Sequence, residues 1–258
     1  MFRARPSRLL PQAAAIGALA LALPSAASSA GPLDVLAGWW PMYEGSGQVV
    51  HDLSGNGNHG TLGATAGKDD SDPTWIKGLF FGSALRFDGN DFVRVPDSPK
   101  LEPQKLTVSL WVRGGSSPGT YRYIIGKGGD GCVSSSYALT TSYNGGLVFY
   151  VWDGRQQHES ALLSPSEIWD GRWHNVAGTW DGVSSRLYLD GVNRGTNQTT
   201  TSTPDYNLPV GDTGIGGYLG TCDLFYTGDV DDVAVFNQPL AVDKIWNAIR
   251  VLFPRPLR

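Results

Sequence analysis

The stretch from Trp169 to Gly191 constrains the fold most strongly, because it sets three Asp-Gly pairs around two short apolar runs. It reads W-D-G-R-W-H-N-V-A-G-T-W-D-G-V-S-S-R-L-Y-L-D-G. Asp-Gly allows both central residues of a tight turn to adopt positive φ, which gives the twist that a two-residue β-hairpin needs. The stretch therefore predicts antiparallel strands folded back on themselves.

Two further segments have the residue pattern of strands. Leu106 to Val112 has an apolar side chain at every second position, as expected of a strand that covers a core with one face. Gly146 to Trp152 is apolar on both faces and is expected inside a sheet. A turn is expected at Asp88-Gly89, between the apolar runs 84–87 and 92–95.

One short helix is expected near the C-terminus. An apolar stripe at helical spacing is formed by Val242, Ile245, Trp246 and Ile249. Pro254 and Pro256 would end such a helix. We therefore expect residues 240–258 to hold this helix and a short basic tail.

The first thirty residues have the pattern of a secretory signal peptide. Three arginines precede the Ala/Leu-rich run from Ala13 to Leu23, and small residues follow up to Ala30. Cleavage is expected after Ala27 or Ala30, which leaves a single domain over residues 31–258. The apolar run is too short to span a bilayer comfortably, so we expect a secreted chain with no membrane span in its mature part; an uncleaved anchor is the alternative.

Charge argues against one class of partner. The chain has 20 basic and 24 acidic residues, and loss of Arg3, Arg5 and Arg8 with the leader leaves 17 basic residues and a net charge of −7. An acidic chain without a Lys/Arg cluster is a poor candidate for binding nucleic acid or an anionic membrane.

Cys132 and Cys222 are the only cysteines. In an exported chain, a single pair is expected to form a disulfide. Two free thiols are the alternative, and two lone cysteines make a poor metal site.

The motifs at the Asp-Gly turns resemble the signature of the laminin-G-like (LamG) jelly-roll superfamily, the concanavalin A-like sandwiches. In that superfamily a strand close to W-H-x-V-A-G-T-x-D-G precedes one close to x-L-Y-x-D-G, as Trp173–Gly182 and Arg186–Gly191 do here. Further matches follow in the family's order: E-G-S-G from Glu44, D-L-S-G-N-G-N-H-G from Asp52, A-L-R-F-D-G from Ala84, L-T-V-S-L-W-V from Leu106 and G-D-V-D-D-V-A-V-F from Gly228. The resemblance covers residues 33–250.

The resemblance implies an all-β fold, a two-sheet antiparallel jelly-roll sandwich whose first and last strands are neighbours. This would bring the turn at residues 52–60 close to the acids of the last strand. Members of the superfamily often carry a structural Ca²⁺, which prefers about six to eight oxygen ligands. The expected ligands are Asp231 and Asp52, followed by Asp229 and Glu44; alternatively, these acids cap turns or face solvent.

The sequence shows no catalytic arrangement. Hydrolases with this sandwich place two Glu around an Asp in an E-x-D-x-x-E string, and this chain has none. Its four histidines are scattered without metal-binding spacing, and no G-x-S-x-G string is present. We expect no catalytic residues, with a divergent polysaccharide hydrolase or lyase as an alternative.

Aromatic residues point to binding instead. The chain has nine Trp and ten Tyr, and flat aromatic rings can stack on sugar rings. The expected ligand-binding residues lie at strand ends and turns. They are Trp152 at a strand end, Arg155 in the loop that follows, Tyr143 in the opposite turn and Tyr218 beside a Gly-rich turn. Trp152 could equally belong to the core.

These features favour a secreted, non-catalytic recognition module. Its expected partner is an extracellular or cell-surface carbohydrate, and the alternative is an extracellular protein bound by an adhesion module. LamG-like folds serve both kinds of partner, so both stay open. Asn197-Gln198-Thr199 is a formal glycosylation sequon, although an ordinary exposed loop is favoured there.

Overall fold

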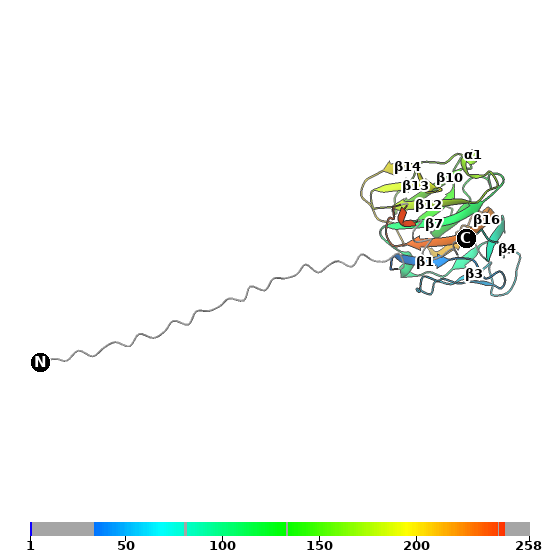
Figure 1. Cartoon of the computed structure of the whole chain (residues 1–258), viewed down its shortest axis with the longest axis horizontal. Coiled ribbons are helices and arrows are strands. Elements are labelled where there is room, and N and C mark those ends of the chain that lie inside the picture. Colours follow the sequence, from blue (N-terminus) through cyan, green and yellow to red (C-terminus); the bar gives the residue numbers. More distant parts are fainter. Residues whose placement is uncertain (2–33, 80–81, 133, 242, 246–258) are drawn as a thin grey trace, which may run out of the picture.

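The computed structural model describes residues 1, 34–79, 82–132, 134–241 and 243–245. The expected leader, residues 1–30, lies outside this range apart from Met1. Two antiparallel eight-stranded sheets pack face to face, which confirms the predicted sandwich. Figure 1 shows the first sheet in front, descending from β14 to β16 and β1.

The first sheet pairs distant parts of the chain. Its strand order is β14 (Val192–Gln198), β13 (Ser184–Leu189), β12 (His174–Trp180), β7 (Leu106–Arg113), β16 (Thr227–Phe236), β5 (Ser83–Asp88) and β4 (Thr74–Lys77). β1 (Leu36–Trp40) also pairs with β16. The first and last strands are therefore neighbours, as the resemblance implied.

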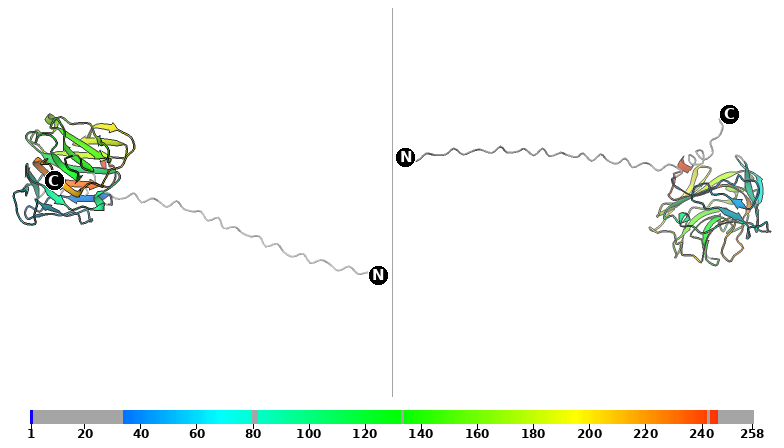
Figure 2. Two further views of the ribbon diagram at one scale, coloured as in Figure 1. Left: turned by 180° about the vertical axis from the view of Figure 1, so that it is seen from behind. Right: turned by 90° about the horizontal axis from the view of Figure 1, so that it is seen from below.

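The second sheet lies behind the first, where its green strands face the viewer in the left panel of Figure 2. Its order is β11 (Gln157–Glu159), β10 (Leu147–Trp152), β9 (Tyr137–Thr141), β8 (Tyr123–Gly129), β15 (Val210–Ile215), β6 (Val93–Val95), β3 (Gly60–Leu62) and β2 (Val49–Val50). β11 and β14 are the edge strands of the two sheets on one side of the sandwich.

The predicted inner faces form one core between the sheets. The side chains from β7 that enter it are Leu106, Val108, Leu110 and Val112, and those from β10 are Leu147, Phe149 and Val151. β10 has a partner on each side, as its two apolar faces indicated. Gly178 of β12 lies against Phe149, since an added Cβ would sit 2.2 Å from the phenyl ring.

Two of the three Asp-Gly pairs close hairpins. Asp190 and Gly191 both have positive φ, 49° and 78°, in the two-residue turn between β13 and β14. Asp181-Gly182 connects β12 to β13. Asp170-Gly171 instead lies between a short helix and β12, and Asp88-Gly89 leads from the first sheet to the second, so neither of these pairs joins adjacent strands.

The helices among the described residues are short. α1 (Pro165–Ile168) was not predicted, because a single turn has no periodic stripe; Ser164 and Glu167 form its capping box. A 3-10 turn, η1, spans Pro99–Leu101. Residues 243–245 of the predicted C-terminal helix are helical, and the rest of its stripe lies outside the described residues.

Among the described helices, none has the length and apolar character required to cross a bilayer.

Candidate functional site

The outer face of the second sheet carries a cluster of tyrosines. Tyr123 of β8 and Tyr150 of β10 share a 2.6 Å hydrogen bond between their hydroxyls, and the Tyr218 ring lies 4.7 Å from that of Tyr123. Burial raises the pKa of Tyr150 to about 12 and raises that of Tyr123 further. The cluster is therefore neutral at physiological pH.

A disulfide covers this cluster. Cys132, in the loop after β8, is bonded to Cys222, in the loop between β15 and β16, with a Cα–Cα distance of 5.3 Å. The predicted pairing is confirmed. Cys222 and Leu224 pack against the tyrosines, so the bridge fixes the loop that lies on them.

Beside the cluster lies a hollow of about 360 Å³, here called the tyrosine hollow. Tyr150 and Val148 of β10 contribute its apolar side, and the Cys132–Cys222 bridge and Leu224 line it too. Its polar lining is Thr140, Ser142, Gln157 and Glu159. Aromatic surface with hydroxyl, amide and carboxylate groups at its edge can stack on a sugar ring and bind its hydroxyls.

Two exposed tyrosines border the hollow. Tyr143 is 67% exposed and Tyr121 is 54% exposed, and both line the hollow. Exposed tyrosine rings supply large contact area at a low cost in conformational entropy, because only two side-chain torsions must be fixed. These two rings are the best placed to meet a ligand.

Hydrogen bonds hold the backbone at both tyrosines. Tyr121 has a positive φ of 56°, an uncommon conformation for a bulky residue, and its N–H donates to the Thr141 carbonyl at 3.1 Å. Backbone strain of this kind persists where surrounding bonds enforce it, and it concentrates at ligand sites. Tyr143 lies in a turn closed by Asn144, whose Oδ1 accepts from the Gly146 N–H at 2.8 Å.

The four predicted ligand-binding residues do not converge. Tyr143 lines the tyrosine hollow, whereas Arg155 lines a separate hollow beyond β11. Trp152 is half-buried and packs against the tyrosine cluster. Tyr218 is 2% exposed, and its hydroxyl is hydrogen-bonded to the backbone of Asp130. The expectation that Tyr218 is a surface residue is therefore wrong: it supports the disulfide-bonded loop.

Sequence reasoning missed Tyr121, Gln157 and Glu159. The sequence predicts only a loop after Trp152, but Gln157–Glu159 is an edge strand that presents alternate side chains to the hollow. The positive φ of Tyr121 has no sequence signal, since that residue type rarely adopts it. The only sequence signal for the strand Gln157–Glu159 is its period-two alternation, and three residues are too few to recognise it.

The four predicted calcium ligands do not form a single cluster. Asp52 accepts from the backbone N–H groups of Trp39 and Asn58, so it organises its own loop. Asp229 lies between Arg86 and Arg113, with Nε–oxygen distances of 2.7 and 2.8 Å. Both carboxylates are occupied by these partners, and the described residues hold no group of three or more His, Cys, Asp or Glu that could bind a metal.

The other two acids, Asp231 and Glu44, differ in their hydrogen bonding. Burial raises the pKa of Asp231 to about 7, and its Oδ2 accepts from the Leu79 N–H at 2.9 Å. Glu44 Oε1 contacts His51, while its buried Oε2 has no partner among the described residues. Adjacent Asp232 accepts from the Trp39 indole, and its Oδ2 is also buried without a partner there.

Comparison with known proteins agrees with this fold. A laminin G family model, described as the concanavalin A-like lectin/glucanases superfamily, matches residues 87–245. No curated protein sequence matches the chain.

Several solved structures are similar to the chain. Domain 4 of AbnA, a GH43 extracellular arabinanase from Geobacillus stearothermophilus solved with arabinotriose, superposes with a TM-score of 0.61 at 15% identity, over 83% of this chain and 98% of that domain. The binding domain of Paraclostridial Mosquitocidal Protein 1 gives 0.64 at 14% identity, over 86% of this chain. The binding domain of Botulinum neurotoxin DC, solved with rat synaptotagmin II, gives 0.62 at 15% identity, also over 86% of this chain. This chain spans 53% and 52% of the two toxin domains. At 14–15% sequence identity, the structural similarity to these domains shows a shared fold alone.

Proposed function

The chain belongs to the concanavalin A-like lectin/glucanases superfamily, and from this premise we propose that it is a secreted, non-catalytic module that binds carbohydrate in the tyrosine hollow. One observation carries the proposal: exposed Tyr121 and Tyr143 border a hollow whose other lining includes Gln157 and Glu159. Domain 4 of the arabinanase, which was solved with arabinotriose, supports this ligand class. The leader-like residues 1–30 support export.

The composition of the hollow favours binding over hydrolysis. Among the described residues that line it, Glu159 is the only carboxylate. Glycosidases of most families need two carboxyl groups, about 5–5.5 Å apart in retaining enzymes and about 6.5–9.5 Å apart in inverting ones. A ligand in this hollow would therefore be bound without being hydrolysed.

Native affinity electrophoresis through gels that contain neutral polysaccharides tests this function. We expect retardation by at least one of arabinan, xylan and glucan, with the polymer left at its original length. Tyr143→Ala and Tyr121→Ala should each weaken binding by more than about 1 kcal/mol, or about fivefold or more, as truncation of an aromatic anchor does.

Tyr43→Ala is the matched control, because Tyr43 is 48% exposed but is not among the residues that line the hollow. Retardation that survives both hollow variants would place the ligand elsewhere. Shortening of the polymer would favour a hydrolase or lyase. No retardation by any polymer would overturn the carbohydrate proposal and favour a protein partner, the kind of ligand with which the neurotoxin DC domain was solved.

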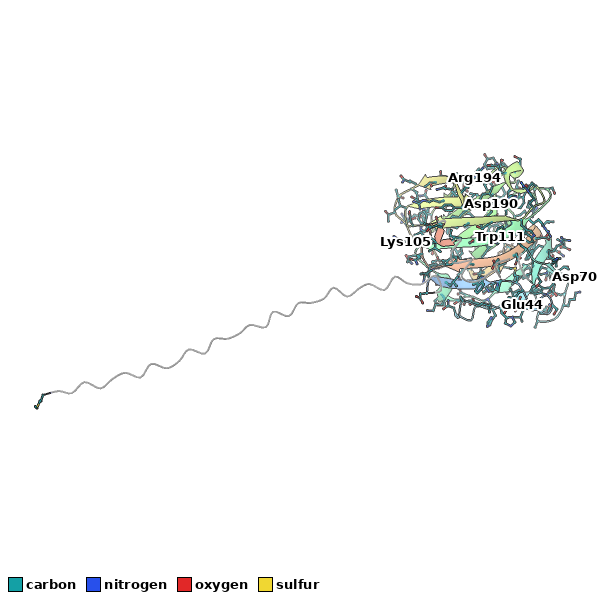
Figure 3. The ribbon with its side chains drawn as sticks, in the orientation of Figure 1. Glu44, Asp70, Lys105, Trp111, Asp190 and Arg194 are labelled. Carbon is teal, nitrogen blue, oxygen red and sulfur yellow. A yellow bond between two sulfur atoms is a disulfide. The ribbon has the colours of Figure 1, made fainter. Side chains whose placement is uncertain are left out.

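We also propose a structural Ca²⁺, held on a smaller set of residues than the sequence suggested. Asp231 and Glu44 remain as carboxylate ligands, and Glu44 Oε2 is buried without a hydrogen bond among the described residues. Ser83 lies between the segments that carry them: its hydroxyl donates to the Met42 carbonyl, and the site of a Gly78 Cβ is 2.6 Å from the Ser83 carbonyl and 3.1 Å from Asp231 Oδ2. The ion would neutralise buried carboxylates and fix the loop after β1; Figure 3 shows Glu44 at the lower side of the sandwich.

Thermal unfolding tests the calcium proposal. Calcium at about 100 times its dissociation constant should add about 2.7 kcal/mol of stability and raise the Tm by about 5–10 °C relative to a chelator. Asp231→Asn should abolish the rise, whereas Asp229→Asn should keep it, since Asp229 is paired with arginines. An unchanged Tm of the wild-type chain on adding calcium would contradict the proposal.

A further inference from the structure

Two more hollows lie near the tyrosine hollow: the first shares residues with it, and the second shares a residue with the first. The amide hollow, of about 260 Å³, has a lining that includes Gln156, Gln157, Glu159, Asn197 and Gln198. The threonine hollow, of about 530 Å³, has a lining that includes Arg155, Gln156 and residues 200–203. Gln157 and Glu159 line the tyrosine and amide hollows, and Gln156 lines the amide and threonine hollows. The three hollows therefore lie one after another across edge strand β11, and this row of hollows is here called the groove.

A buried histidine fixes the walls of this groove. His158 of β11 is 4% exposed and its ring stacks on Trp180, with the ring centroids 5.3 Å apart. Its Nδ1 lies 2.9 Å from Thr199 Oγ1, and its Nε2 lies 2.7 Å from Asp153 Oδ2 and 3.0 Å from Ser202 Oγ. One side chain thus joins β11 to the loops on both sides of the threonine hollow.

A second contact joins the two sheets beneath the groove. The Asn197 side-chain amide on β14 donates to the Glu159 carbonyl on β11 at 3.0 Å. Each of these strands is the edge of its sheet, so the groove crosses the sandwich where the two edges meet. Walls held by such bonds need little ordering when a ligand binds, which favours affinity.

The lining changes character along the groove. The tyrosine hollow has aromatic and apolar residues, whereas the other two hollows have amides and hydroxyls from Gln156, Asn197 and the threonines of 199–203. Of the charged groups, Asp153 is occupied by His158 and by the backbone N–H groups of residues 155 and 156. Glu159 and Arg155 are the charged side chains left to meet a ligand, and they have opposite charges. Amides and hydroxyls suit the hydroxyls of uncharged sugars.

We propose that the groove binds an extended run of linked, uncharged sugars, with one end on Tyr143 and the other beside Arg155 and Gln156. The inference rests on the proposed carbohydrate-binding function and adds that the ligand is the interior of a chain rather than a single terminal sugar. It also explains why Tyr143 and Arg155 lie in separate hollows: they bind different sugars of one ligand.

Calorimetric titration with oligomers of arabinose, xylose and glucose, each of one, two, four and six sugars, tests this inference. In the series that binds, affinity should rise about tenfold or more from the disaccharide to the hexasaccharide. The double variant Arg155→Ala/Gln156→Ala should remove most of that rise, because both residues are exposed and line the threonine hollow. Tyr143→Ala should weaken binding at every length.

Lys68→Ala is the control for loss of an exposed cation, and it should match the wild-type chain at each length. If affinity depends on Tyr143 but is the same for two and six sugars, the groove proposal is overturned and the carbohydrate function stands. If no oligomer of any series binds, both are overturned. Tighter binding of a uronic acid oligomer than of any neutral oligomer would contradict the assignment to uncharged sugars.

Discussion

Gly178 shows how closely the two sheets approach. An added Cβ would lie 2.2 Å from the Phe149 ring, which is fully buried between the sheets. Gly178→Ala should therefore force β12 and β10 apart and cost about 1–3 kcal/mol, as overpacking of a core does. The expected fall in Tm is about 3–10 °C.

Gly67→Ala is the matched control. No atom lies within 4 Å of its added Cβ, and its φ is not in the left-handed region. Differential scanning calorimetry should show the Gly67 variant close to wild type. Equal melting temperatures for the Gly178 variant and the wild-type chain would show that the sheets can separate at this point without cost.

His174 links the fold to pH. Burial opposes its charged form, but hydrogen bonds to Asp190 at 2.7 Å and Asp170 at 3.1 Å outweigh burial and raise the pKa of its ring. A raised pKa in the folded state adds stability below the unfolded-state pKa, about 6.5, and that contribution is lost as pH rises through the higher folded-state value.

His174→Gln should therefore lose more stability at pH 5 than at pH 8.5. The expected difference is a few tenths to about 1 kcal/mol, because Asp190 is 46% exposed and solvent weakens its attraction. Urea unfolding at the two pH values measures it. A loss that is the same at both would show that the ring acts only through packing and neutral hydrogen bonds.

Single residues also mark the limit of what the sequence predicts. The sequence placed Tyr143 at the surface because the turn between two neighbouring strands is exposed in whatever way the sheets pack. Tyr218 also lies in a Gly-rich turn, but the Cys132–Cys222 bridge holds its loop against the sheet and buries the ring. Burial of a turn depends on what packs over it, and this is a non-local property.

The disulfide acts at the level of elements. It closes a loop of 90 residues and holds two loops over the tyrosine cluster. In the chain-entropy model its loss costs about 4–5 kcal/mol, so the double variant Cys132→Ser/Cys222→Ser should lower the Tm by about 10 °C or more. Carbohydrate affinity should also fall, because both cysteines line the hollow.

Reduction of the disulfide in the wild-type chain is the control for the double serine variant. Thermal unfolding with and without a reductant should reproduce the loss for the wild type, and the reductant should leave the serine variant unchanged. A serine variant as stable as the wild-type chain would show that packing alone holds these loops.

The alternation of side chains along the sequence predicted a strand only where the alternating segment was long. β7 and β10 were predicted because six or more residues show a clear facing pattern. The turn at Asp190-Gly191 was predicted because few residue pairs tolerate two positive φ values. β11 was missed because a three-residue edge strand gains its conformation from pairing with β10 rather than from its own sequence.

At the scale of the whole molecule, the order of family motifs predicted the sandwich and the pairing of β1 with β16. It did not predict the groove, which forms where edge strands β11 and β14 of different sheets approach each other. Nor does the sequence of β16 alone reveal that Asp229 faces Arg86 and Arg113 of neighbouring strands, which is why Asp229 leaves the proposed calcium site.

The measurement that tests the central claim most directly is a crystal structure of the chain with a hexasaccharide from the polymer that retards it. The account predicts a sugar ring stacked on Tyr143, with its hydroxyls within hydrogen-bond distance of Gln157 or Glu159 and further sugars continuing toward Gln156. A sugar seated on the outer face of the first sheet, where Figure 3 places Trp111, would contradict the account, as would a tyrosine hollow without sugar.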